Sequence, residues 1–205
     1  MTKEDNVKKI ISSIKRKLVT RMKTYLVPLG FTPTTTTYWN RYTKTLRHTF
    51  EFRQLNWREF HVRHGLQILD PFGDSEKNSD SYCCSIEKHW KNLPKDNTEI
   101  DKFLDGIMLH IKHIEETFFS KYQEVAQLIR DYDLKKIPKE YLSESICWRN
   151  HRMGIAYFDA KKYSQAMSHF QKVIDLYSDD DLEFVRIRKA SAEKWISKIK
   201  KLQSQ

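Results

Sequence analysis

Residues 46–68 read LRHTFEFRQLNWREFHVRHGLQI and contain two runs in which apolar and polar side chains alternate. A period of two is typical of β-strands that have one buried and one exposed face. The short NW segment between the runs predicts an antiparallel hairpin. This stretch therefore indicates a small sheet with one apolar face, and another element has to cover that face.

The alternation assigns the side chains of the two strands to opposite faces. We expect the apolar face to carry Leu46, His48, Phe50, Phe52, Phe60, Val62, His64, Leu66 and Ile68. We expect the other face to carry Arg47, Thr49, Glu51, Arg53, Glu59, His61, Arg63 and Gln67. Gln54 and His48 are polar residues on the apolar side, and we interpret them as structural because a buried polar group needs hydrogen-bond partners.

The outward face of the predicted sheet carries the charged and aromatic side chains that are best suited to bind a ligand. The candidate binding residues there are Arg41, Arg47, Arg53, His61, Arg63 and Trp39. Arginine beside aromatic rings is what a single-stranded nucleic acid or an acidic protein surface favours, through phosphate or carboxylate pairing and stacking. An ordinary solvated sheet face has the same composition, so that alternative stays open.

The flanking segments complete an α+β domain. Residues 5–29 carry apolar side chains at spacings of three and four and predict an amphipathic helix that lies on the sheet. Residues 34–42, TTTTYWNRY, are β-branched and aromatic, which predicts one further strand. Residues 71–81 predict a loop, and a fourth strand is expected near residues 81–86.

From residue 97 onward the apolar period is helical. We expect one long helix or two helices in line over 97–132 with Thr98 as a cap, and then helices over 141–158, 162–177 and 180–203. Within the last part, four residues have the spacing of a tetratricopeptide repeat: Gly154, Tyr157, Ala166 and Phe170. A single unit of this kind cannot bury its own face, so it indicates a helical hairpin packed on another element.

The predicted architecture is α+β, with an N-terminal helix on an antiparallel sheet of three to four strands followed by a helical C-terminal half. We divide the chain into an α+β domain over 1–135 and a tetratricopeptide-like extension over 136–205. The chain has 205 residues and a net charge of +10, and its N-terminus lacks an apolar signal region. Three cysteines without a disulfide spacing, and no apolar run of about 20 residues, predict a cytoplasmic protein without a membrane partner.

No catalytic or metal-binding constellation emerges from the sequence. His110 with His113, and His61 with His64, lack the further ligands that zinc requires, and the five glycines form no phosphate-binding loop. Cys147 lies between Ile146 and Trp148 and predicts a buried structural thiol. We therefore expect a protein without enzymatic activity, cofactor or metal.

Short motifs along the chain resemble a bacterial domain family of unknown function. The motifs are LVPLGF at 26–31, FRQLNW at 52–57, FHVRHGLQI at 60–68 and FFSKYQEV at 118–125. The matching positions are Leu29, Gly30, Phe31, Gln54, Phe60, Val62, Gly65 and Leu66. The resemblance covers residues 10–177, and the chain departs from it at Arg63, where the family often has Asn. It implies no established activity, although some small families of this type resemble immunity proteins that accompany bacterial toxins.

Two functional hypotheses follow. The first is a non-enzymatic protein-binding module, including an immunity-like role, that uses the sheet face, the helical groove or both. The second is a basic nucleic-acid-binding protein that uses the N-terminal helix and the outer sheet face, because residues 1–70 carry a large excess of Lys and Arg over Asp and Glu. The sequence leaves the partner, any substrate and the oligomeric state open.

Overall fold

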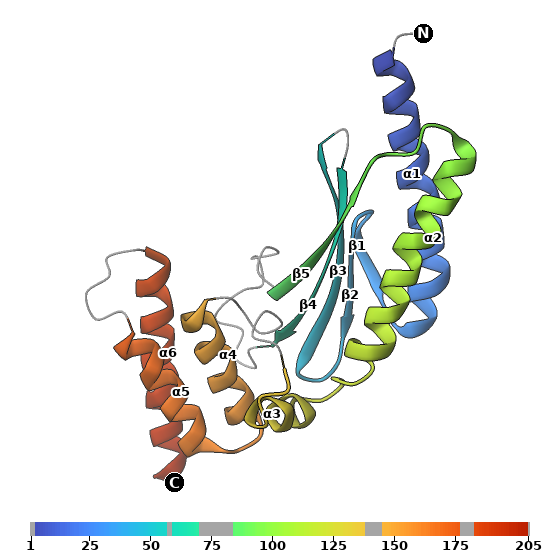
Figure 1. Ribbon diagram of the computed structural model, residues 1–205. Coiled ribbons are helices and arrows are strands. Elements are labelled where there is room, and N and C mark those ends of the chain that lie inside the picture. The colour runs from blue at the N-terminus through green and yellow to red at the C-terminus, as the bar shows by residue number, and fades with distance from the viewer. Residues whose placement is uncertain (1–2, 57–58, 70–83, 138–144, 177–182, 205) are drawn as a thin grey trace. The chain divides into compact units, whose positions relative to one another are not determined.

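The computed structural model describes residues 3–56, 59–69, 84–137, 145–176 and 183–204 (Figure 1). The internal contacts of the chain divide it into two compact units. The first unit comprises residues 1–42, 48–65 and 86–121, and the second comprises 43–47, 66–85 and 122–205. The predicted domain boundary after residue 135 stays a prediction, and the observed division groups residues 122–135 with the C-terminal helices.

The structure confirms the α+β class, with an N-terminal helix, an antiparallel sheet and a helical C-terminal half. The sheet has five strands in the order β1-β2-β3-β4-β5. The elements up to residue 119 are α1 (Lys3–Leu26), the 3-10 turn η1 (Val27–Leu29), β1 (Thr32–Thr35), β2 (Tyr38–Tyr42), β3 (Leu46–Asn56), β4 (Glu59–Ile68), β5 (Cys84–Lys91), α2 (Asn97–Ile114) and the π-helical segment η2 (Glu115–Phe119).

Helices α1 and α2 lie side by side over one face of the sheet (Figure 1). The helices bury one apolar stripe each, and the strands bury the alternating residues that the sequence placed on the apolar face. The ring of Phe103 on α2, for example, lies 6.1 Å from that of Phe60 on β4. At the solvent side, the Asp101 carboxylate accepts hydrogen bonds from Lys17 and Arg21 of α1, each at 2.9 Å. The core of this unit therefore lies between the helix pair and the sheet.

The structure corrects one predicted strand and one predicted helix cap. Residues 34–42 do not form one strand, because the chain turns at 36–37 and separates β1 from β2, with Pro33 opposite Trp39. Over residues 97–132, where one long helix or two were expected, the structure has two: α2 ends at Ile114, η2 follows, and a new helix begins at Val125. The cap of α2 is also not Thr98 but Asp96, whose carboxylate accepts hydrogen bonds from the backbone N–H groups of Thr98 and Glu99.

The second unit contains α3 (Val125–Asp133), α4 (Ile146–Asp159), α5 (Tyr163–Asp175) and α6 (Glu183–Gln203). Gly154 of α4 faces the ring of Phe170 of α5, so that a Cβ at residue 154 would lie only 2.6 Å from a ring carbon. The other side of the Phe170 ring system is occupied by Trp195 of α6, which stacks on it at 5.5 Å between centroids. The close helix crossing expected at Gly154 is therefore present, whereas the tetratricopeptide assignment itself stays a prediction.

Two helical glycines form a matched pair that tests this crossing. In Gly154→Ala the added methyl would overlap the Phe170 ring, and we expect the unfolding free energy to fall by about 1–3 kcal/mol. In Gly106→Ala on α2, the nearest neighbour of the added methyl is Trp90 Nε1 at 3.7 Å, which is an ordinary contact. Because alanine has the higher helix propensity, the unfolding free energy of this variant should rise by about 0.5–1 kcal/mol. Chemical denaturation of both variants measures the difference, and equal effects would contradict the close crossing.

Candidate functional site

The structure places two of the predicted sheet-face residues on the opposite face. Backbone hydrogen bonds from Thr43 N to Leu46 O and from Phe52 N to Thr37 O set the register in which Arg41 stands opposite His48. Arg41 therefore points toward the helices, and Trp39, two residues earlier on β2, shares that face and is only 1% exposed. The expectation that both project outward is wrong, because the strand register pairs Arg41 with His48 on the face that packs against the helices.

Arg47 and His61 lie on the predicted outer face but are buried, with exposed fractions of 8% and 2%. Thr49 and Gln67 on the same face are buried as well. The expectation that this face is solvent-exposed along its length is therefore wrong at these positions. Neither side chain is available to a ligand that approaches from solvent.

Arg53 and Arg63 are the members of the set that reach the surface, and both lie beside a carboxylate. Glu51 pairs with Arg53, and its other oxygen lies 3.5 Å from an Arg63 nitrogen. Farther along the face, Glu59 contacts the His89 ring nitrogen at 2.8 Å. The single carboxylate of Glu51 thus offsets part of the charge of the two arginines, and an anionic ligand would compete with it for both.

The helix-facing side contains a buried ion pair. The Arg41 guanidinium donates to the Glu115 carboxylate at 2.7 Å, and the two side chains are only 12% and 8% exposed. Arg41 also donates to His48 Nδ1, which requires the neutral tautomer of His48 with its proton on Nε2. The centroid of the His48 ring lies 4.7 Å from that of Phe119, and the two rings are stacked. This packing agrees with the interpretation of His48 as a structural residue. Gln54 is half-buried, and its predicted role in joining strand ends stays a prediction.

Four histidines are held neutral by burial. Desolvation lowers the pKa of His64 to about 3, and the neighbouring His110 lowers it further; desolvation likewise lowers the pKa of His110 to about 4. In the second unit, burial lowers the pKa of His151 to about 3 and that of His169 to about 4. His151 is hydrogen-bonded to Ser191 Oγ, and His169 is bonded to Asn150 and stacked on Tyr157. These are the environments of packed core residues.

The described residues contain no group of three or more His, Cys, Asp or Glu side chains placed to hold a metal ion. Cys147 is fully buried as predicted, and desolvation raises the pKa of its thiol, which keeps it in the unreactive protonated form. Within the described parts of the chain, each helix is too short or too polar to cross a bilayer.

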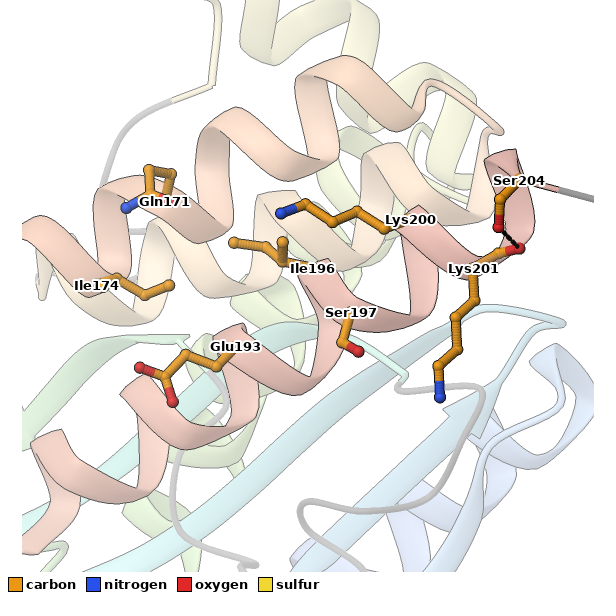
Figure 2. A pocket seen from close by; sticks show the side chains of 8 residues that line it. All are labelled: Gln171, Ile174, Glu193, Ile196, Ser197, Lys200, Lys201 and Ser204. Atoms are coloured by element: carbon orange, nitrogen blue, oxygen red, sulfur yellow. Dashed lines mark hydrogen bonds between the residues drawn. The ribbon is translucent and has the colours of Figure 1, made fainter.

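A groove of about 610 Å³ runs between α5 and α6 (Figure 2). Its walls carry one half-buried isoleucine from each helix, Ile174 and Ile196, with Gln171 beside them on α5. The remaining lining residues lie on one face of α6 and directly after its end, at spacings of three and four: Glu193, Ser197, Lys200, Lys201 and Ser204. Their polar side chains are exposed, so the groove has an apolar centre with a charged rim.

Among the described residues, the core contacts of α6 lie on a different side of the helix from the residues that line the groove. Ala192, Trp195 and Ile199 are buried and form the inner stripe of the helix, and Trp195 contacts Phe158 and Phe170. Ile196 lies one position beyond that stripe. Sequence reasoning identified the helix but missed the groove, and the available signal was an isoleucine that lies off the core stripe, between lysines.

No protein-family model, curated protein or solved structure matches this chain. The resemblance to an uncharacterised bacterial family therefore stays a prediction.

A double-mutant cycle tests the buried ion pair. In Glu115→Gln the Arg41 charge stays buried without its counter-charge, and we expect a loss of about 3–5 kcal/mol in unfolding free energy. In Arg41→Met/Glu115→Leu both charges are removed together, and most of that loss should be recovered. Urea denaturation measures both, and single and double variants of equal stability would contradict a strong coupling.

The buried histidines predict a loss of stability in mild acid. Below pH 6.5 the unfolded chain protonates these rings while the folded protein, with pKa values of about 3 for His64 and about 4 for His110, does not. Stability should therefore be highest above pH 6.5 and fall as the pH decreases toward 4. Denaturation at several pH values measures the slope. In His64→Leu the slope should decrease by up to about 1.4 kcal/mol per pH unit, the contribution of one proton, and an unchanged slope would contradict this assignment.

Proposed function

We propose that the protein is a non-enzymatic protein-binding module and that the groove between α5 and α6 is its docking site. The observation that carries the proposal is the combination of two half-buried isoleucines with a rim of lysines on helices whose inner faces are already packed. A solvated helix surface needs no such apolar centre, whereas a docking surface gains affinity from one.

The dimensions of the groove favour a segment of protein. The lining residues of α6 extend from Glu193 to Lys201, which at a rise of 1.5 Å per residue is about 12 Å, or roughly two helical turns. Such a groove presents a row of separate contact points, which suits an extended or helical segment better than a compact small molecule. Ile174 and Ile196 would supply the apolar contacts, and Lys200 and Lys201 the polar rim.

The nucleic-acid alternative receives less support from the geometry. Arg41 is engaged with Glu115, and Arg53 and Arg63 lie beside Glu51. Phosphate binding on the sheet face would therefore begin by displacing an existing counter-charge. This alternative and the immunity-like role both stay predictions.

Site-specific crosslinking of the full chain tests the docking site. A photoreactive amino acid at Ser197, used in nuclease-treated native lysate, should attach to a distinct protein, which is then purified and titrated against the unmodified chain. Because Lys200 and Lys201 form the rim, Lys200→Glu/Lys201→Glu should weaken that binding about tenfold or more, or by at least ~1.4 kcal/mol.

The matched control is Lys15→Glu/Lys23→Glu, which makes the same change in net charge at two exposed positions on α1. Its affinity for the partner should stay close to that of the unmodified chain. Equal losses in the two variants would show a non-specific charge effect and contradict the assignment to the groove. Absence of any crosslinked protein, or affinity unchanged by Lys200→Glu/Lys201→Glu, would contradict it as well.

A further inference from the structure

We propose that the segment bound between α5 and α6 is an acidic amphipathic helix that runs antiparallel to α6. The inference deepens the proposed docking function and depends on it, because it specifies the occupant of the same groove. It is carried by the secondary structure of the walls, by the charge of α6 and by the order of charges along the groove.

The secondary structure of the walls favours a helical occupant. Both walls are helices, whose backbone N–H and C=O groups bond within the helix, so an extended strand would find no sheet edge to pair with. Two packed helices instead present a furrow into which the side-chain ridge of a third helix fits. Ile174 and Ile196 face this furrow from its two walls (Figure 2), where the apolar stripe of a third helix would cover them.

The charge of α6 favours an acidic occupant. The helix contains seven Lys or Arg residues and two Glu residues. Lys200 and Lys201 both line the groove and are exposed, so their ammonium groups are accessible to carboxylates of a bound segment. A basic segment would meet like charges at this end, and like-charge contacts across an interface are strongly unfavourable.

The order of charges along the groove sets the direction of the bound helix. Glu193 lies at one end and Lys200 with Lys201 at the other, about two turns farther along α6 (Figure 2). Helices are stabilised by acidic residues in their first turn and basic residues in their last turn, because these charges oppose the helix dipole. A partner helix of this common type matches the groove when its N-terminus lies at Lys200 and Lys201 and its C-terminus lies at Glu193. That orientation is antiparallel to α6.

Two synthetic peptides of identical composition test the inference on the full chain. Both are amphipathic, of about 18 residues or five turns, with leucines at helical spacing, and both are stapled so that their helix contents are equal. The first has Glu in its first turns and Lys in its last turn, and the second has the reverse order. By fluorescence anisotropy the first should bind about tenfold more tightly than the second, as expected when three rim charge pairs change from attractive to repulsive.

The charge-exchanged variant Glu193→Lys/Lys200→Glu/Lys201→Glu should reverse this preference, while Lys15→Glu/Lys23→Glu should preserve it. Equal affinities for the two peptides would overturn the proposed direction, and tighter binding of the second peptide to the unmodified chain would overturn it too. If neither peptide binds, the helical occupant is overturned, whereas a partner crosslinked at Ser197 would still support the docking site. If the photoreactive group at Ser197 attaches to a second copy of this chain, the groove is a self-association site and the inference fails.

Discussion

The packing of the first unit depends on a buried ion pair between Arg41 and Glu115. A lone buried charge is strongly destabilising, so the 2.7 Å contact between them fixes the C-terminal end of α2 against β2. The same guanidinium donates to His48 on β3 and to the carbonyl oxygen of Leu29, and it lies 4.6 Å from the centre of the Phe31 ring. One side chain thus joins the turn after α1, two strands and the π-helical segment.

The π-helical segment is consistent with this constraint. Within η2, Glu115, Phe118 and Phe119 are buried, and the Phe119 ring contacts Phe31 and Phe50 as well as His48. A wider helical turn changes which residues face inward, and here it brings a carboxylate and two aromatic rings to the same surface. The LGF turn at 29–31 has a matching role: Gly30 adopts φ +85°, and Arg41 carbons lie within 3.8 Å of the position that a Cβ there would occupy. Leu29, Gly30 and Phe31 of this turn therefore all lie against Arg41.

The sequence was sufficient to predict those features of the fold that follow from the periodicity of apolar residues. The inward residues of β3 and β4, from Leu46 to Ile68, are buried as the alternation indicates, and Gly154 meets Phe170 as its spacing indicates. The candidate binding face was less predictable, because a surface position requires knowledge of what covers it. Arg47 and His61 follow the correct alternation and are nevertheless buried. Arg41 was misplaced because its partner Glu115 lies far away in the sequence, and no local pattern relates the two.

The two units use their charged side chains in different ways. In the first unit, Arg41 pairs with Glu115 in the core, and Arg53 and Arg63 share the carboxylate of Glu51 at the surface. In the second unit, Lys200 and Lys201 flank Ile174 and Ile196 on a face that the core of the unit does not use. Under the proposed docking function, an acidic, partly apolar segment would cover the two isoleucines and pair with the two lysines. This contrast favours the pair formed by α5 and α6 over the basic sheet face as the surface that binds a partner.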